Sequence, residues 1–599
     1  MPKRLTRSEA PENQTWNLED LFRTKADWKA EMESIEADLS GVVKYKGRLG
    51  EGASVLLECA EALEALTGRA YRAFNYAGLA LATDGTNPEY QEAMGLVGAL
   101  AAKLEAETAF VRSEVLALPD GTVERYLEEE PALGEFRRML EKMLAEKPYL
   151  LSPETEVALA SFGEVLEAPY TIYQRSKSSD MTFEPVKDKD GKEHPMSFAT
   201  YEVSYETSPD TVLRRNAFAS FTKGLNAYKN TFGAIFGTEV KRHVVEAKLR
   251  KYPSVTHMLL QPQEIPVEVY HNLHDVIQAE LAPHMRKYVE FRKRKLGLDK
   301  ILYCDIEAPL DPEYDPKVSF EDAEKMLAEA FEVMGPEYVE ILRAAFKDRW
   351  IDWSDNVGKS TGAFCADPYG VHPYILTTWA DSLRCVFTLA HELGHAVHSV
   401  YSQRNQRLVN TDVSLFFVEA PSTIHELILG NHILANKSDL RMRRWVLMTF
   451  LATYYHNFVR HMLEAELQRR LYRLAEAGQT ITANTLSSTK GEVLNDFWAG
   501  VVEVDEGARL TWMRQPHYYN GLYPYSYSAG LTCATAVAQD IREEGAPAIE
   551  RWINVLKAGG TKKPLDLMKM AGVDLSKPEP IKKAVAYVGS LVDELVESF

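Results

Sequence analysis

TLAHELGHAVHS, residues 388–399, holds three histidines and one glutamate within eight positions. We expect a helix through this stretch that begins after Asp381 or Ser382, either of which can cap it. His391 and His395 are four residues apart, so on a helix they lie about 40° apart on one face, one turn above the other. Two imidazole nitrogens placed in this way can bind one zinc ion at about 2.0–2.1 Å.

The residue between the two histidines adds a possible catalytic group. Glu392 follows the first histidine, so its carboxylate can reach a water molecule on the ion without binding the ion itself. Gly394 leaves room for another element to come close. Together these residues form the pattern HExxH, which places a zinc pair and a general base on one helix. Because the pattern fixes only three positions, a chance match on an amphipathic helix is the alternative.

The third histidine of the stretch needs a separate interpretation. His398 lies on the same stripe as His391, but seven residues further on, which is roughly 10 Å along the helix axis. We therefore interpret it as a packing or hydrogen-bonding residue. The related pattern HExxHxxGxxH is excluded, because it requires glycine and histidine where this chain has His398 and Tyr401.

A third ligand is available in FFVEAPSTIHEL, which follows the histidine stretch. Glu419 stands 24 residues after His395. Pro421 suits the first turn of a helix, so we expect Glu419 close to a helix start. An ordinary surface carboxylate is the alternative, but the apolar neighbours at 416–418 disfavour it, because buried carboxylates need a partner. Glu426, two turns further on, is a weak candidate for orienting an imidazole, and we favour a solvated position for it.

A third motif is aromatic. The loop PHYYNGLYPYSYSAG, Pro516–Gly530, contains His517 and five tyrosines. Imidazole and phenol groups can donate hydrogen bonds to an oxyanion that develops during hydrolysis, and each such donor contributes about 3 kcal/mol. An aromatic cluster at an interface is an equally good interpretation of the loop alone. The tyrosines are Tyr518, Tyr519, Tyr523, Tyr525 and Tyr527.

The rest of the chain is typical of a mainly helical protein. Amphipathic spacing dominates up to about residue 180, and a short hairpin is expected around Asp190-Gly191. Two further strands are expected at Gly362–Cys365 and Pro373–Trp379, and the second could either pair with an extended peptide or belong to a small structural sheet. The change from helical spacing to short alternation of apolar and polar residues near residue 180 suggests an N-terminal helical domain over 1–200 and a catalytic domain over 201–599.

Composition limits the function classes. The 599 residues carry a net charge of −19, which argues against a general affinity for nucleic acid or anionic membranes. The five cysteines are scattered and form no CxxC, as expected for a reducing compartment. The longest apolar run is too short for the ~20 residues of a membrane span. We expect a soluble, cytoplasmic protein, and the sequence does not indicate an oligomeric state.

The motifs together resemble a known family. TLAHELGHAVHS, FVEAPS and PHYYNGLYPYSYSAG, in this order and at these separations, are similar to segments of the oligoendopeptidase F branch of the thimet-oligopeptidase-like zinc metallopeptidases. TWNLEDLF, KPYLLSPETE, GAFC, HPYILTTW and LKAGGTKKPLDLMKMAGVD extend the resemblance over nearly the whole chain. It implies a mainly α-helical, two-lobed fold with a zincin-like core, a deep central channel and cleavage of short peptides.

The resemblance also implies residue roles. It places one Zn²⁺ per chain on His391, His395 and Glu419, with Glu392 as the general base. His517 and Tyr527 correspond to the donors that bind the oxyanion, and Tyr519 and Tyr523 to substrate-binding groups. Two rival functions stay open: a carboxy-terminal dipeptidase on the same core, and a peptide-binding protein with a structural zinc.

Overall fold

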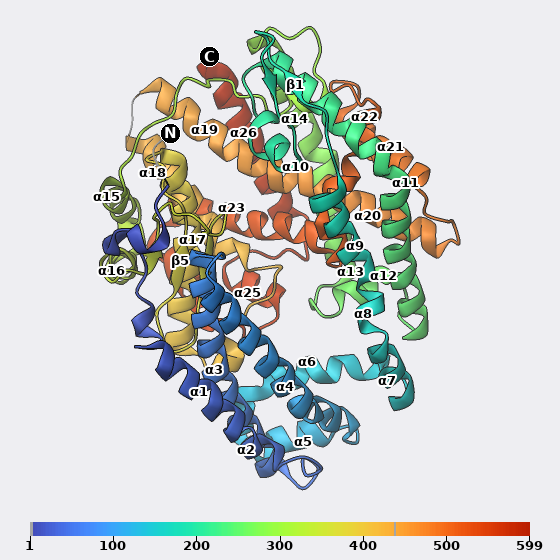
Figure 1. The fold of residues 1–599 in the computed structure, drawn as a ribbon, viewed down its shortest axis with the longest axis vertical. Coiled ribbons are helices and arrows are strands. Elements are labelled where there is room, and N and C mark those ends of the chain that lie inside the picture. The colour runs from blue at the N-terminus through green and yellow to red at the C-terminus, as the bar shows by residue number, and fades with distance from the viewer. Residues whose placement is uncertain (1–3, 437–438) are drawn as a thin grey trace.

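Helices dominate the computed structural model, which describes residues 4–436 and 439–599 (Figure 1). The N-terminal helices gather at the bottom of the view, and α11 and α12 form its right side. The first six helices are α1 Lys25–Asp38, α2 Ser40–Val43, α3 Ala53–Thr83, α4 Pro88–Ala117, α5 Thr122–Glu129 and α6 Arg137–Glu146.

These six helices enclose a hydrophobic core of their own. Trp28 and Ile35 of α1 are fully buried in it, together with Leu133, which stands just before α6. The indole Nε1 of Trp28 donates to the carbonyl of Ala73 in α3 at 2.8 Å, so the largest side chain of this core is also hydrogen-bonded.

A second, larger core begins at Tyr173 and extends to Leu595. Two short helices precede it and bury no side chain, α7 Pro153–Ser161 and α8 Gly163–Leu166. Its first helices are α9 Ala168–Arg175, α10 Phe198–Thr200, α11 Thr211–Leu249, α12 Val255–Leu260, α13 Val267–Val276, α14 Ala282–Lys295, α15 Phe320–Ala330 and α16 Pro336–Lys347. The later ones are α17 Leu383–Asn405, α18 Glu419–Asn436, α19 Leu440–Tyr454, α20 His461–Glu476, α21 Ala483–Trp498, α22 Glu506–Arg509, α23 Ser526–Glu544, α24 Ala546–Ala558, α25 Pro564–Met570 and α26 Glu579–Ser598.

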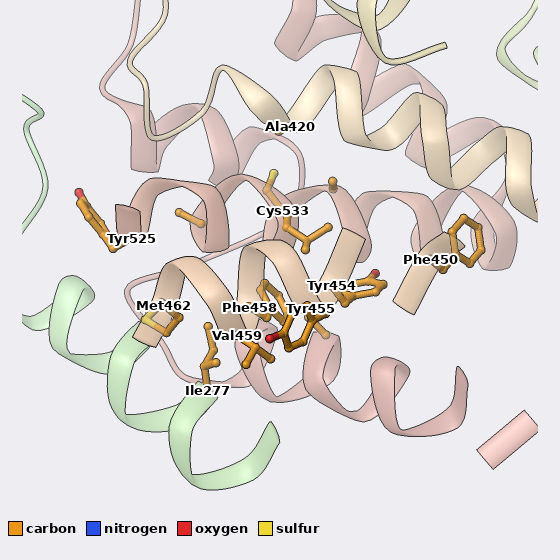
Figure 2. Close-up of a cluster of buried hydrophobic side chains, with 14 of the residues drawn as sticks. Ile277, Ala420, Phe450, Tyr454, Tyr455, Phe458, Val459, Met462, Tyr525 and Cys533 are labelled. Atoms are coloured by element: carbon orange, nitrogen blue, oxygen red, sulfur yellow. The ribbon is translucent and has the colours of Figure 1, made fainter. Parts of the chain in front are cut away.

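Figure 2 shows the part of this core behind the start of α18. Ala420 of α18 and Cys533 of α23 face the aromatic side chains of α19 and of the π-helical turn that follows it. All of these side chains are at least nine-tenths buried, and Tyr454 donates to or accepts from the hydroxyl of Thr535 at 2.6 Å. The start of α18 is therefore anchored in a dense apolar environment.

The strands form two small sheets. β1 Val186–Lys187 and β2 Glu193–His194 pair antiparallel, and Gly191 between them has φ 79°, so the expected hairpin is confirmed. β3 Ile351–Asp352, β4 Phe364–Ala366 and β5 Tyr374–Leu376 form a three-stranded sheet in the order β3-β5-β4. The sequence predicted β4 and β5 but not β3, which has only two residues.

The strand order decides between the two interpretations of HPYILTTW. β5 pairs parallel with β3 and antiparallel with β4, so both of its backbone edges are occupied. Of the two interpretations of HPYILTTW, a strand of a small structural sheet is therefore confirmed, and pairing with an extended peptide is excluded for Tyr374–Leu376. The edge strands are β3 and β4, and both residues of β3 are buried, whereas those of β4 are partly exposed. β4 is therefore the edge to which a peptide backbone can add.

Most of the chain before α1 packs on this sheet, and Phe22 also contacts the N-terminal core. Trp16 lies edge-on to Tyr374 of β5, with ring centroids 5.9 Å apart, and Leu5 forms a bridge with Asn356. The expectation of a mainly α-helical fold with a small sheet is confirmed, whereas a domain boundary near residue 200 stays a prediction. Within the described residues, no helix is both long and apolar enough to cross a membrane.

One close contact between helices positions the candidate site. α17 is capped by Ser382, whose Oγ accepts from the backbone N–H of Cys385 at 3.4 Å. Further along α17, a Cβ on Gly394 would lie 2.6 Å from the carbonyl oxygen of Pro421 and 2.6 Å from Cα of Ser422. Only glycine therefore allows α17 to approach the first turn of α18 this closely.

We expect Gly394→Ala to destabilise the protein, because the added methyl group meets rigid backbone. Overpacking of this kind typically costs about 1–3 kcal/mol of the free energy of unfolding. The matched control is Gly78→Ala in α3, where a Cβ would meet nothing within 4 Å and alanine has the better helix propensity. Denaturant unfolding measures both variants, and equal stability of the two would contradict the close approach.

Candidate metal centre

The three side chains expected to bind a metal lie together. His391 and His395 project from adjacent turns of α17, and Glu419 is the first residue of α18. The Nε2 atoms of the two histidines lie 3.3 and 3.6 Å from Oε2 of Glu419, and one ligand atom of each residue lies within 4.8 Å of the others. All three side chains are partly exposed, between 21% and 29%, so the cluster is accessible.

Hydrogen bonds fix the orientation of His391. Its Nδ1 lies 2.7 Å from Oε1 of Glu426, and Thr453 donates to the other oxygen of Glu426 at 3.2 Å. The preference for a solvated Glu426 was wrong, because its side chain is only 16% exposed and bonded at both oxygens. A carboxylate that accepts from Nδ1–H holds the tautomer with a free lone pair on Nε2, which is the form that binds a metal.

The chemistry of these donors fits a divalent cation. In this tautomer of His391, the lone pair on Nε2 faces the carboxylate of Glu419, and two acceptors at 3.3 Å repel unless a cation lies between them. Protonation is the alternative. Burial lowers the pKa of His391, but the hydrogen bonds that its ring donates to Glu419 and Glu426 outweigh burial and raise this pKa well above its ordinary value. Two imidazoles and one carboxylate form the ligand set of many catalytic zinc sites.

The carboxylate of Glu419 is also held in place. Ser422, one turn further along α18, donates to its Oε2 at 3.0 Å. Burial raises the pKa of Glu419, but hydrogen bonds from His391 and His395 outweigh it and lower this pKa far below its ordinary value. Glu419 is therefore an anion at any ordinary pH, as a ligand must be.

Glu392 is the buried carboxylate beside the cluster. It is 6% exposed, and burial raises its pKa above the ordinary value, against the opposing effect of His391 and His395. A carboxyl group with a raised pKa can take up and return a proton closer to neutral pH. His398 plays no part in the cluster: it is buried and edge-on to Phe417, which confirms its packing role.

The aromatic loop divides into two groups. His517 stacks on Tyr523 at 5.3 Å between centroids, and the ring of Tyr527 lies edge-on to both. Tyr519 instead contacts Tyr173 at 5.0 Å, together with Tyr170 and Phe236. The structure thus brings together three of the four predicted loop residues, and Tyr519 belongs to a different aromatic group.

α23 connects the first aromatic group to the metal ligands. Tyr527 and Gly530 lie one turn apart on one face of α23, and a Cβ on Gly530 would lie 3.2 Å from Cβ of Glu419. Burial, Tyr523 and the charge of Glu419 all raise the pKa of Tyr527, so its hydroxyl keeps its proton. Tyr527 is therefore a hydrogen-bond donor beside the cluster.

Sequence reasoning missed two histidines next to this group. His461 stacks on Tyr527 at 4.3 Å between centroids, with 18° between the ring planes, and lies edge-on to His517. Its Nε2 lies 3.0 Å from Nε2 of His456. The sequence around 455–461 carries no motif that would have revealed them, because the contact depends on how α20 packs against the loop.

Two helices that cross at a glycine bring the histidines of HExxH together with a distant glutamate, and this arrangement defines the zincin class of metallopeptidase. Residues 204–587 match peptidase family M3, and residues 114–183 match the family described as oligopeptidase F. The chain therefore belongs to peptidase family M3.

Relatives agree with this assignment over the whole chain. Oligopeptidase PepF of Bacillus subtilis is 32% identical over 591 residues, which cover 99% of this chain and 88% of the relative. An oligoendopeptidase F homolog of Lactococcus lactis is 29% identical, with 98% of both chains covered. The resemblance to oligoendopeptidase F deduced from the sequence is thus confirmed.

Solved structures show the same fold. A putative peptidase from Chlamydophila abortus superposes with a TM-score of 0.92 at 26% identity and covers all of both chains. The oligoendopeptidase-F from Enterococcus faecium gives a TM-score of 0.74 at 27% identity, with 96% of this chain and 99% of that chain covered.

We expect Glu426→Gln to weaken metal binding, because an amide holds the Nδ1–H of His391 less strongly than a carboxylate does. Loss of such a supporting partner typically costs about 10–100-fold in metal affinity. Competition with a chromogenic chelator measures the affinity. Glu329→Gln, at an exposed position near the end of α15, is the control. Unchanged zinc affinity in Glu426→Gln would contradict the orienting role of Glu426.

Proposed function

We propose that this chain is a zinc-dependent endopeptidase that hydrolyses internal bonds of short peptides. The observation that carries the proposal is the convergence of His391, His395 and Glu419, with buried Glu392 beside them, in a chain of peptidase family M3. Relatives named oligopeptidase and oligoendopeptidase support short peptides as the substrate class.

His391, His395 and Glu419 would hold the ion, one per chain. When bound there, zinc supplies Lewis acidity, which lowers the pKa of water and polarises a carbonyl group. Glu392 takes a proton from the attacking water and returns it to the leaving amine. Its raised pKa supports both steps, since the same group must accept the proton and then release it.

His517 and Tyr527 bind the oxyanion in this proposal. Tyr527 is supported by its place on α23 beside Glu419 and by the raised pKa that keeps its hydroxyl protonated. His517 is supported by its ring contacts with Tyr527. Its Nδ1–H donates to Oε1 of Gln515 at 2.8 Å, so its Nε2 donates to the oxyanion when the ring carries a second proton. Preorganised donors of this kind need no rearrangement as charge develops.

Substrate contacts complete the proposal. An extended peptide adds its backbone to β4, the partly exposed edge strand of the three-stranded sheet. Tyr523, stacked on His517, contacts the peptide near the cut bond, and Tyr519 contacts it further away. The proposed catalytic domain over 201–599 carries all of these groups, and the proposed N-terminal helical domain over 1–200 carries none of them. Five unpaired cysteines support action in the cytoplasm.

We expect Glu392→Gln to retain zinc but to lose most of its turnover. General acid–base catalysis contributes a rate factor of about 10²–10⁴, so kcat should fall by a factor in this range. His391→Ala should lose both zinc and activity, and His432→Ala, at the other end of α18, is the control. A quenched fluorescent peptide with an amidated C-terminus and an assay of metal content measure the outcomes.

Two results would contradict the proposal. Near-normal cleavage by Glu392→Gln would remove the base assignment. No cleavage of the amidated peptide by the native enzyme, together with cleavage of its free-acid form, would indicate a carboxy-terminal dipeptidase.

We expect Tyr527→Phe to lower kcat by about 10²–10³-fold and to change KM little, because a donor to the oxyanion acts mainly in the transition state. Tyr454→Phe, which removes a buried hydroxyl bonded to Thr535, is the matched control. A rise in KM at unchanged kcat would make Tyr527 a group that only binds substrate.

A further inference from the structure

A buried ion pair contacts the aromatic loop Pro516–Gly530 through Tyr518. Lys490 of α21 and Glu464 of α20 are 1% and 3% exposed, and Nζ of Lys490 lies 2.5 Å from Oε1 of Glu464. The other oxygen of Glu464 accepts from the hydroxyl of Tyr518, which is 1% exposed. Tyr518 is the direct neighbour of His517 in a 3₁₀ turn over Pro516–Tyr519.

The side chains that meet the loop form one stripe on α20. His461, Glu464 and Gln468 are spaced by three and four residues, which places them on one face of the helix. Gln468 donates to the carbonyls of Tyr518 at 3.2 Å and of Gly521 at 2.9 Å. Glu464 and Gln468 thus both hold the turn at Tyr518, and His461 stacks on Tyr527 further along the loop.

Stability alone does not explain why this position holds an ion pair. Moving two charges out of water is costly, and replacing a buried ion pair with apolar residues is often neutral or stabilising. Tyr518 is also packed without its hydroxyl, because its ring stacks on Phe236 at 4.6 Å between centroids and 10° between planes. What the charged pair adds is a directional bond that fixes where the 3₁₀ turn lies.

We propose that the Lys490–Glu464–Tyr518 chain is a positioning device for catalysis, which holds His517 at the place where it meets the developing oxyanion. This inference rests on the proposed function, in which His517 is a donor. Tyr518, Glu464 and Lys490 contact no substrate in this proposal and act only through the loop. A displacement of about 1 Å at a catalytic group can cost about 10²-fold in rate.

Tyr518→Phe tests the inference, because it removes only the hydroxyl and keeps the stacked ring. We expect kcat to fall between about 10- and 100-fold, with KM changed by less than about two-fold and zinc content unchanged. Tyr126→Phe is the matched control. Its buried hydroxyl donates to the carbonyl of Gly50 at 3.0 Å in the N-terminal core, far along the chain from the loop. This control should retain native kcat.

A double-mutant cycle separates positioning from a general loss of structure. If Tyr518 acts through His517, Tyr518→Phe should have little further effect in a His517→Gln background, so the two losses should not multiply. Gln468→Leu, which removes the other anchor of the turn, should behave in the same way. Multiplying losses, or native kcat in Tyr518→Phe, would overturn the inference.

The proposed function fails by a different result. Native kcat in His517→Gln alone would remove the donor role of His517, and the positioning role of Tyr518 with it. A loss of kcat in His517→Gln combined with multiplying losses in the cycle would overturn the positioning role only.

Discussion

The close approach of helices to the first turn of α18 is the constraint on which the site depends. Two histidines on one helix supply only half of a metal site, and the third ligand must come from a crossing element. Gly394 of α17 meets the backbone at Pro421, and Gly530 of α23 meets Glu419 itself. A side chain at either glycine would separate the metal ligands from one another or from Tyr527.

The same approach concentrates charge that a cation must balance. Glu419, Glu426 and Glu392 lie around two imidazoles in a largely buried region, and Glu419 is an anion there. Without a cation, His391 compensates by holding a proton, as its raised pKa shows. A divalent ion held by His391, His395 and Glu419 would take the place of that proton and would relieve more repulsion.

The features that the sequence predicted are local. The spacing of His391 and His395, the helix start at Glu419 and the hairpin turn at Gly191 depend on neighbours a few residues away. The order of the three-stranded sheet could not be predicted in this way, because it depends on β3, two residues with no periodicity of their own. Glu426 was misjudged for a related reason: helical spacing shows which face it shares, but not which helix covers that face.

The donor half of the site rests on a different framework from the metal half. α17 and α18 carry the proposed ligands, whereas α20 holds the loop through His461, Glu464 and Gln468. Lys490 of α21 in turn bonds to Glu464. α23 joins the two, since Tyr527 stands in its first turn and Gly530 touches Glu419 one turn later. In the proposed site, a single helix would therefore set the distance between the metal ligand Glu419 and Tyr527, while the loop that precedes this helix needs anchors of its own. The need to anchor the loop explains why the Lys490–Glu464 ion pair bonds to Tyr518 of the loop and not to the helices of the metal ligands.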